Sequence, residues 1–285
     1  MPVKIVADNC CDLPKEMIQA LDIAQIHMQL RFGTEEIAPE DFEPAQFYRM
    51  MQERPDSPAT SQPAVEEMFD VYQHALADGS EVVAVHFSSG MSGTYSSTLM
   101  VRDQLAGKER LQIIDSRKAS NGLGLMVMEA GLMAKAGASA AEIVARMEEM
   151  QRTVRCLFSP NSLEYLVKGG RVSRVKGFVS DVLDIKAILH VDQEGYIVAY
   201  DKVRGRKAAL KRMLKLFEQE GTNLSEQTVF ITHAACEADA LFLKDYIENH
   251  IPVKKILICE IGPVIGSHAG PGTVCIFFEG IESKE

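Results

Sequence analysis

Residues 81–97 read EVVAVHFSSGMSGTYSS and join a continuous apolar run to a loop rich in glycine and hydroxyl side chains. A short apolar run bounded by turn residues predicts a buried strand at 81–87. A helix is expected to follow the loop, to about residue 106. A strand, a glycine-rich loop and a helix in this order can surround an anion with backbone N–H donors. The loop matches neither G-x-G-x-x-G nor G-x-x-x-x-G-K-[ST], and Ser92 does not lie in a G-x-S-x-G elbow. We therefore expect it to bind an anion rather than to cleave a substrate.

Strands and helices alternate on both sides of this stretch. Further strands are predicted at 3–7, 23–32 and 111–115, and helices at 14–21, 44–52, 62–76, 119–136 and 139–152. Asp12 and Ser61 are expected to cap the first and third of these helices, and Ser139 with Glu142 predicts a capping box on the last. This alternation predicts a parallel sheet between layers of helices, with right-handed crossovers.

Three positions in this half follow strands or precede helices, namely Asp8, Thr60 and Ser92. Ligands of parallel sheets bind at the carboxyl ends of the strands, so we expect all three to lie on that edge. Thr60 is expected just ahead of a helix N-terminus, where amides and the helix dipole favour an anion. An ordinary capping role for Thr60 and its neighbour is the alternative.

The pattern changes near residue 155. Strands are predicted at 155–159, 185–191, 196–203, 227–233, 254–261 and 273–279, with helices at 161–171, 204–220 and 237–249. Consecutive strands joined by a hairpin indicate an α+β arrangement with a largely antiparallel sheet. The predicted fold is therefore α/β, with an N-terminal α/β/α domain of parallel sheet at 1–155 and a C-terminal α+β domain at 156–285.

Composition narrows the class of protein. The chain has 285 residues, a net charge of −10 and 46% hydrophobic residues, which argues against nucleic acid as the main partner. No apolar run reaches 18 residues and the chain enters a strand directly, so no membrane span or signal peptide is expected. The six cysteines lack C-x-x-C spacing and no His/Cys cluster resembles a zinc site, which favours a reducing cytoplasm and no metal. A redox role for the adjacent Cys10 and Cys11 is the alternative.

The stretch 262–273 contains four glycines, two prolines, a serine and His268 between two apolar runs. It is expected to be a loop whose glycines allow close approach of the backbone to a ligand, since an ordinary surface turn needs fewer glycines and prolines. Histidine readily binds or transfers a proton, so His268 is a candidate site residue. An incidental histidine in a turn is the alternative.

Four motifs occur in one order along the chain: Thr60-Ser61-Gln62-Pro63, residues 88–95, Leu163-Glu164-Tyr165-Leu166 running into residues 169–171, and residues 266–272. Together they make the chain resemble the DegV family nearly end to end. That family comprises bacterial fatty-acid-binding proteins, some of which are the lipid-carrying subunit of a fatty acid kinase. The resemblance implies a parallel-sheet α/β domain joined to a second α/β domain, with one long-chain fatty acid buried and its carboxylate near the junction.

By motif position, Thr60 and Ser92 resemble the family's carboxylate-binding hydroxyls, and His268 resembles the histidine that completes their network. The resemblance also implies kinase contact at Arg204, with Arg206 beside it. Supporting site positions are Ser61, Gly93, Thr94, Arg171 and Gly270. The chain departs from the family pattern at Asn9, Cys10, Cys11, Ala64 and Ala269, where Ser or Thr is common, so the detail of the network is expected to differ.

The physical reading agrees with this resemblance. A buried carboxylate needs hydrogen bonds or a charged partner, and two hydroxyls with an imidazole supply them without a metal or cofactor. We expect a cytoplasmic carrier, not an enzyme, that binds a fatty acid such as palmitate and presents it to a kinase. The 14 methionines suit a channel for chains of varied shape, with ordinary core packing as the alternative.

Two other functions remain open at this point. One is a hydrolase or acyltransferase with Ser92 as nucleophile and His268 as base, oriented by Asp8 or Asp115. The other is a lipid-responsive regulatory protein that binds an acidic partner through residues 168–215, which hold 12 Lys+Arg and 5 Asp+Glu. A solvated helix face would equally explain this basic segment.

Overall fold

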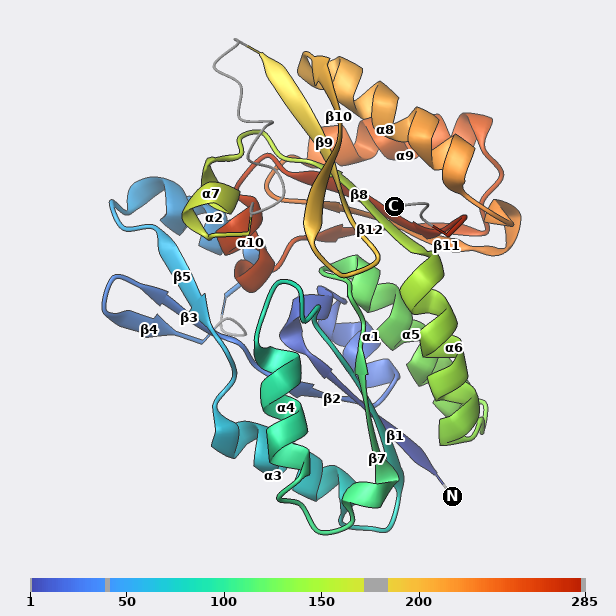
Figure 1. Ribbon diagram of the computed structural model, residues 1–285. Coiled ribbons are helices and arrows are strands. Elements are labelled where there is room, and N and C mark those ends of the chain that lie inside the picture. The colour runs from blue at the N-terminus through green and yellow to red at the C-terminus, as the bar shows by residue number, and fades with distance from the viewer. Residues whose placement is uncertain (1, 39–41, 172–183, 283–285) are drawn as a thin grey trace.

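A computed structural model describes residues 2–38, 42–171 and 184–282 of the chain. Its first sheet has the order β2-β1-β6-β7, and all neighbouring strands run parallel (Figure 1). The strands are β1 (Val3–Asp8), β2 (Ile23–Ile26), β6 (Glu81–His86) and β7 (Leu111–Asp115). The predicted parallel sheet is confirmed.

Helices cover both faces of this sheet. One face packs against α3 (Val65–Leu76) and α4 (Thr94–Arg102). Met68 and Tyr72 of α3 join Val6, Val82 and Ala84 of the sheet in one apolar cluster. The other face packs against α5 (Asn121–Lys135) and α6 (Ala140–Thr153), and α1 (Lys15–Ala20) lies beside β2. Successive side chains of a strand point to opposite faces of the sheet. Each strand therefore contributes to an apolar cluster on either face, and helices cover both clusters.

The second sheet has the order β10-β9-β8-β13-β11-β12, and only the β11–β12 pair among these described strands is parallel. Its strands are β8 (Val154–Ser159), β9 (Ile185–Val191), β10 (Ile197–Arg204), β11 (Thr228–His233), β12 (Lys255–Glu260) and β13 (Val274–Glu279). The largely antiparallel second sheet is confirmed. The domain limits 1–155 and 156–285 stay a prediction.

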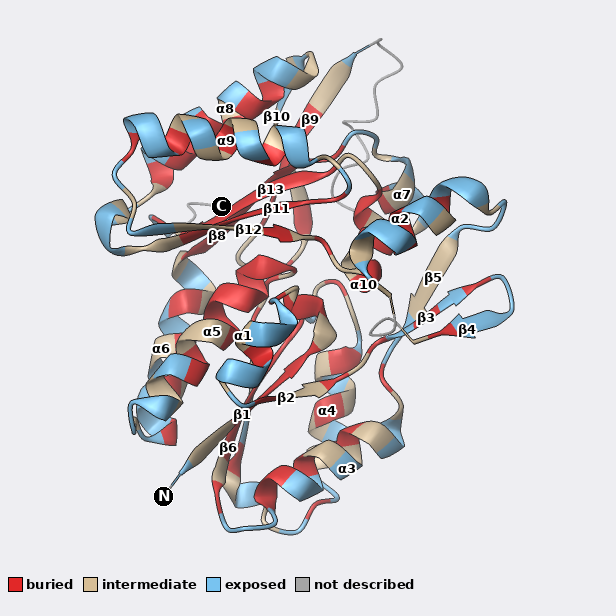
Figure 2. Cartoon of the chain, turned by 180° about the vertical axis from the view of Figure 1, so that it is seen from behind, coloured by how far each residue is buried: buried red, intermediate tan, exposed pale blue. Residues whose placement is uncertain are grey.

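The two sheets share one helix. On the outer face of the second sheet lie α8 (Arg206–Glu220) and α9 (Glu237–His250), whose exposed sides face away from the strands (Figure 2). The inner face of the second sheet packs against α5, which also contacts β1 and β6 of the first sheet. Residues 121–127 of α5 are all buried, because a helix held between two sheets has no solvent-facing side there.

A smaller sheet, of order β4-β3-β5, stands beside both: β3 (Gln29–Phe32), β4 (Glu35–Ile37) and β5 (Pro58–Ser61). The predicted single strand at 23–32 is therefore wrong, since it divides between two sheets. At the break, His27 N donates to Glu67 and Met28 N donates to Asn9, so side chains replace the ladder. Near this sheet lie α2 (Pro44–Glu53), α7 (Glu164–Lys168) and α10 (Pro263–Ala269).

Two predicted caps are wrong, because distant partners take up their side chains. Ser61 lies on β5 and donates to Gln29, and α3 begins after Ala64. Asp12 ends the 3-10 helix Asn9–Cys11, and its carboxylate accepts from Gly262 N (3.0 Å) and Ser120 Oγ (2.6 Å). The predicted capping box of Ser139 is confirmed.

The stretch 262–273 is not wholly a loop. Residues 263–269 form α10, with Pro263 in its first turn and Gly266 N donating to Gly262 O. Residues Lys108–Arg110 and Leu224–Glu226 also form 3-10 helices, and both lie in connections. The basic segment 168–215 falls partly on 172–183, which lies outside the described residues.

Candidate functional site

A cavity of about 320 Å³ opens among β5, α10, the two sheets and the N-terminus of α5. Most of its wall is apolar or carries thiols and thioethers, from Cys10, Met28, Phe87, Met91, Ala119, Cys156, Phe158, Leu166, Val191, Ile197, Ile261, Val264, Ile265, Ala269, Cys275 and Phe277. An apolar pocket with few polar groups is the usual form of a small-molecule site.

Polar groups of the wall gather where β5, α10 and the loop before α4 meet. They are Thr60, Gln62, Ser92, Arg171 and His268. The hydroxyls of the other polar lining residues are already engaged: that of Ser61 with Gln29, Ser120 with Asp12, and Thr273 with Ala269 O.

Thr60 Oγ1 and His268 Nε2 lie 2.7 Å apart, although 208 positions separate them in the chain. Thr60 is held by pairing of β5 with β3 opposite Leu30, and His268 stands in the last turn of α10. Burial and, to a smaller extent, the charge of Arg171 lower the pKa of His268 to about 4. The imidazole is therefore neutral at pH 7.

The surroundings of His268 decide which nitrogen carries the proton. Nδ1 is buried and has no hydrogen-bond partner among the described residues. It faces Gly169, where any Cβ would collide with Nδ1. A buried N–H without an acceptor is rarer than a buried lone pair without a donor. We therefore assign the proton to Nε2, which donates to Thr60 Oγ1 and leaves the Thr60 proton free to donate into the cavity.

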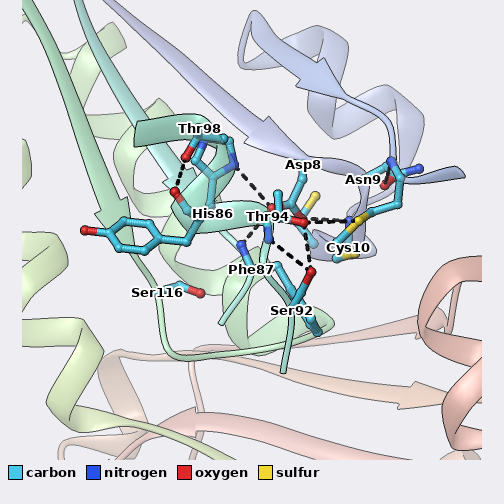
Figure 3. A network of polar contacts seen from close by, with 12 residues as sticks. Asp8, Asn9, Cys10, His86, Phe87, Ser92, Thr94, Thr98 and Ser116 are labelled. Atoms are coloured by element: carbon cyan, nitrogen blue, oxygen red, sulfur yellow. Dashed lines mark hydrogen bonds and ion pairs between the residues drawn. The ribbon is translucent and has the colours of Figure 1, made fainter. Parts of the chain in front are cut away.

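Ser92 has a similar arrangement at the start of α4. Its Oγ accepts from Thr94 N (3.2 Å) and lies 2.9 Å from Thr94 Oγ1 (Figure 3). When the Thr94 hydroxyl donates to Ser92, the Ser92 proton is free for a ligand. Thr94 Oγ1 also lies 3.4 Å from Met28 Sδ, a weak acceptor, so Ser92 is its stronger partner.

Arg171 brings a positive charge to this end of the cavity. Its guanidinium donates to Met91 O and Gly169 O and is half-buried. Burial lowers its pKa, which an arginine tolerates without losing its proton. Within residues 2–38, 42–171 and 184–282, no carboxylate pairs with it. Within the described part of the chain the guanidinium contacts carbonyl oxygens, and a half-buried cation with such partners can still pair with an anion.

The hydrolase alternative needs a hydrogen bond between Ser92 and a base. His268 Nε2 pairs with Thr60, and the polar partner of Ser92 is Thr94, so the required bond is not formed. Asp8 does not line the cavity. It is fully buried and accepts from Phe87 N and Cys10 N beside the Ser92 loop (Figure 3).

The remaining predicted residues lie as follows. Gly93 precedes α4. Gly270 ends α10 with φ 75° against the ring of Tyr165, a conformation and an approach that suit glycine. Arg204 is exposed at the end of β10. The Arg206 guanidinium is engaged inside the protein, with Asp239, Ser159 O and Gly272 O.

Cys10 and Cys11 are free, buried thiols, and burial raises the pKa of Cys11 to about 12. Among the described residues no group of three or more His, Cys, Asp or Glu could hold a metal ion. In the same residues no helix has the length and hydropathy needed to span a bilayer.

Sequence reasoning missed Gln62 and the bridging role of Asp12. Gln62 stood in a quoted motif, but nothing local indicated that it lines the cavity. The contacts of Asp12 with Gly262 and Ser120 join residues more than 100 positions apart. Burial raises the pKa of Asp12 to about 7, against the lowering effect of these two hydrogen bonds.

Comparison with known proteins gives concordant results. The model of the DegV family of uncharacterised proteins matches residues 2–280. A DegV domain-containing protein of Clostridium perfringens is 37% identical, covering 99% of this chain and 98% of the relative. A protein of Thermotoga maritima named fatty acid-binding protein is 32% identical over the full length of both. Among solved structures, a DegV family protein from Thermus thermophilus, described by its fatty acid binding, superposes with a TM-score of 0.91 at 28% identity, covering 99% of this chain and 100% of the other. DegV of Bacillus subtilis, described as a fatty acid binding protein, gives 0.87 at 29% identity, with 98% and 99% covered.

Proposed function

The chain belongs to the DegV family, and we propose that it binds one long-chain fatty acid with its carboxylate held by Thr60, Ser92 and His268. The observation that carries this proposal is an apolar cavity whose polar end holds the Arg171 guanidinium, which has no carboxylate partner among the described residues, and the hydroxyls of Thr60 and Ser92. An anionic head group and an apolar tail match the two parts of this wall. Relatives named for fatty acid binding support the same ligand class.

The tail supplies most of the affinity on this proposal. About 15 buried methylenes at ~0.8 kcal/mol each contribute roughly 12 kcal/mol before ordering costs are subtracted. The head group then fixes the orientation of the chain. Thiol and thioether side chains in the wall, such as Cys156 and Met28, are polarisable and adapt to the shape of the chain.

We assign different tasks to the three head-group residues. Thr60 and Ser92 donate to the carboxylate. His268 is neutral and acts through Thr60, because its Nε2 proton occupies the Thr60 oxygen. Arg171 compensates the ligand charge from nearby. No proton is moved in this arrangement, which suits binding of a carboxylate.

We further propose that the protein is a cytoplasmic carrier, without an active site of its own, that presents the carboxyl group to a separate fatty acid kinase. The carboxylate would lie at the junction of domains 1–155 and 156–285. Arg204, which is exposed, is the proposed kinase contact. Arg206 is tied to Asp239 and is better assigned to holding α8.

Denaturing mass spectrometry of the purified protein tests the ligand. We expect one C14–C18 fatty acid, such as palmitate, per chain, and repeated absence from protein that also fails to bind added palmitate would refute the proposal. His268→Ala is expected to retain less fatty acid while staying folded. Unchanged loading of this variant would show that His268 does not support the carboxylate.

A separate measurement tests the carrier role. With palmitate loaded, Arg204→Glu is expected to slow acyl-phosphate formation by a partner kinase while the Kd for palmitate stays unchanged. Equal rates for wild type and variant would remove Arg204 from the docking surface.

A further inference from the structure

Gln62 stands at the boundary between the cavity and solvent. It lies between β5 and α3, it lines the cavity, and it is exposed. The other polar lining residues at this end, Thr60, Ser92, Arg171 and His268, are half-buried. Gln62 is thus the solvent-side member of the polar group.

The amide of Gln62 is held in place from the first turns of α4. Ser97 Oγ donates to Gln62 Oε1 at 2.5 Å. With its oxygen engaged in this way, the amide has two N–H donors left on Nε2. No acceptor for them occurs among the residues that the structure describes.

Gly93 provides the space for Nε2. A Cβ at position 93 would collide with Gln62 Nε2 before any other atom. The φ of Gly93 is −75°, which any residue adopts, so the backbone does not require glycine there. Glycine suits position 93 for a steric reason, because the Gln62 amide packs directly against this residue.

We infer that Gln62 is a further head-group ligand, whose Nε2 donates to the carboxylate from the solvent side. This inference rests on the proposed function. A bound anion selects the amide orientation with Nε2 toward it, because the reverse orientation would set Oε1 lone pairs against the negative charge. Ser97 Oγ donates to Oε1 in that orientation, so its hydrogen bond to the side chain is kept when Nε2 faces the ligand.

Paired measurements of palmitate and 1-hexadecanol affinity test this role. The two ligands share a tail, and only the acid is charged. Gln62→Ala is expected to weaken palmitate binding by about 3- to 10-fold, which is less than for a fully buried charged hydrogen bond because the site is partly exposed. Gln62→Glu should weaken it by at least about 10-fold, since a second carboxylate repels the first. Hexadecanol affinity should change by less than about twofold in both variants, and Gln73→Ala on the exposed side of α3 serves as the matched control.

A double-mutant cycle separates the donor from general disturbance. Gly93→Ala should displace Nε2 and reproduce the loss seen in Gln62→Ala, and in the Gln62→Ala background it should have no further effect. Additive losses, or equal losses for acid and alcohol, would overturn the inference. So would an unchanged palmitate Kd in Gln62→Ala with faster association and dissociation, which would make Gln62 a cover only. Wild-type protein that binds neither ligand would instead refute the proposed function.

Discussion

Replacing Thr60 by valine keeps the shape of the side chain and removes its hydroxyl. Two interactions are lost together. The carboxylate loses the donor supplied by Thr60, and His268 Nε2–H loses the acceptor that lies 2.7 Å away. Because Nδ1 of the same ring has no partner among the described residues, His268 is left without any polar contact there.

The size of the effect follows from these two losses. A hydrogen bond to a charged group contributes about 1.5–3 kcal/mol, which corresponds to roughly a 10- to 150-fold increase in the Kd for palmitate. The stranded imidazole N–H costs about 1–3 kcal/mol in the unliganded protein, so the free energy of unfolding should fall as well. Thr60→Ser retains the hydroxyl and should lose much less in both measurements.

Displacement of a fluorescent fatty acid measures the first effect, and urea unfolding of delipidated protein measures the second. If Thr60→Val bound palmitate within twofold of wild type, Thr60 would not be a carboxylate ligand. If Thr60→Ser were as weak as Thr60→Val, the loss would come from packing rather than from the hydroxyl. Either outcome would refute the reasoning from the Thr60–His268 pair.

Three more predictions concern the same framework. Gly169→Ala should push the His268 ring away and weaken palmitate binding, which the displacement assay would detect as a raised Kd; equal affinity would mean that the ring can shift freely. The folded-state pKa of His268, about 4, lies below its ordinary value of 6.5, so the unfolded chain binds more protons between these values and the free energy of unfolding should fall as pH drops from about 6.5 to 4. In urea titrations, the free energy of unfolding of His268→Gln should fall less steeply with decreasing pH than that of wild type. An identical pH dependence would contradict a neutral, buried His268. Arg155→Met should lower the free energy of unfolding by about 3–5 kcal/mol, because it strands Glu220 in a pair whose side chains are 5% and 7% exposed; a loss below about 1 kcal/mol in urea unfolding would show that water reaches the pair.

Local patterns were sufficient for the regular elements. The apolar run at 81–87 and its neighbours predicted a parallel sheet, and β1, β6 and β7 form it together with β2. Ser139 and Glu142 predicted a capping box, which is present, because all of its partners lie within four residues. The hairpin of β9 and β10 was also predicted, since its turn lies between two well-patterned strands.

Local patterns failed where a distant residue competes for a side chain. Asp12 and Ser61 have the chemistry of N-caps, but Gly262, Ser120 and Gln29 supply partners that no local window contains. In the same way, pairing with β3 makes residues 58–61 a strand, which no local pattern predicted. An N-cap side chain must accept a hydrogen bond from a backbone N–H of the helix that follows it. The side chains of Asp12 and Ser61 bind distant residues instead.

The sequence by itself determined the layered α/β fold and, through its resemblance to the DegV family, the expectation of Thr60, Ser92 and His268 at an anion site. Only the tertiary structure decided how these residues are arranged. It brought Thr60 and His268 together across 208 positions, buried the imidazole so that it stays neutral, and set Arg171 and Gln62 beside them. The physical reason is that residue type sets which hydrogen bonds a side chain can make, whereas burial and the partners that folding brings near set its charge and the direction of its proton.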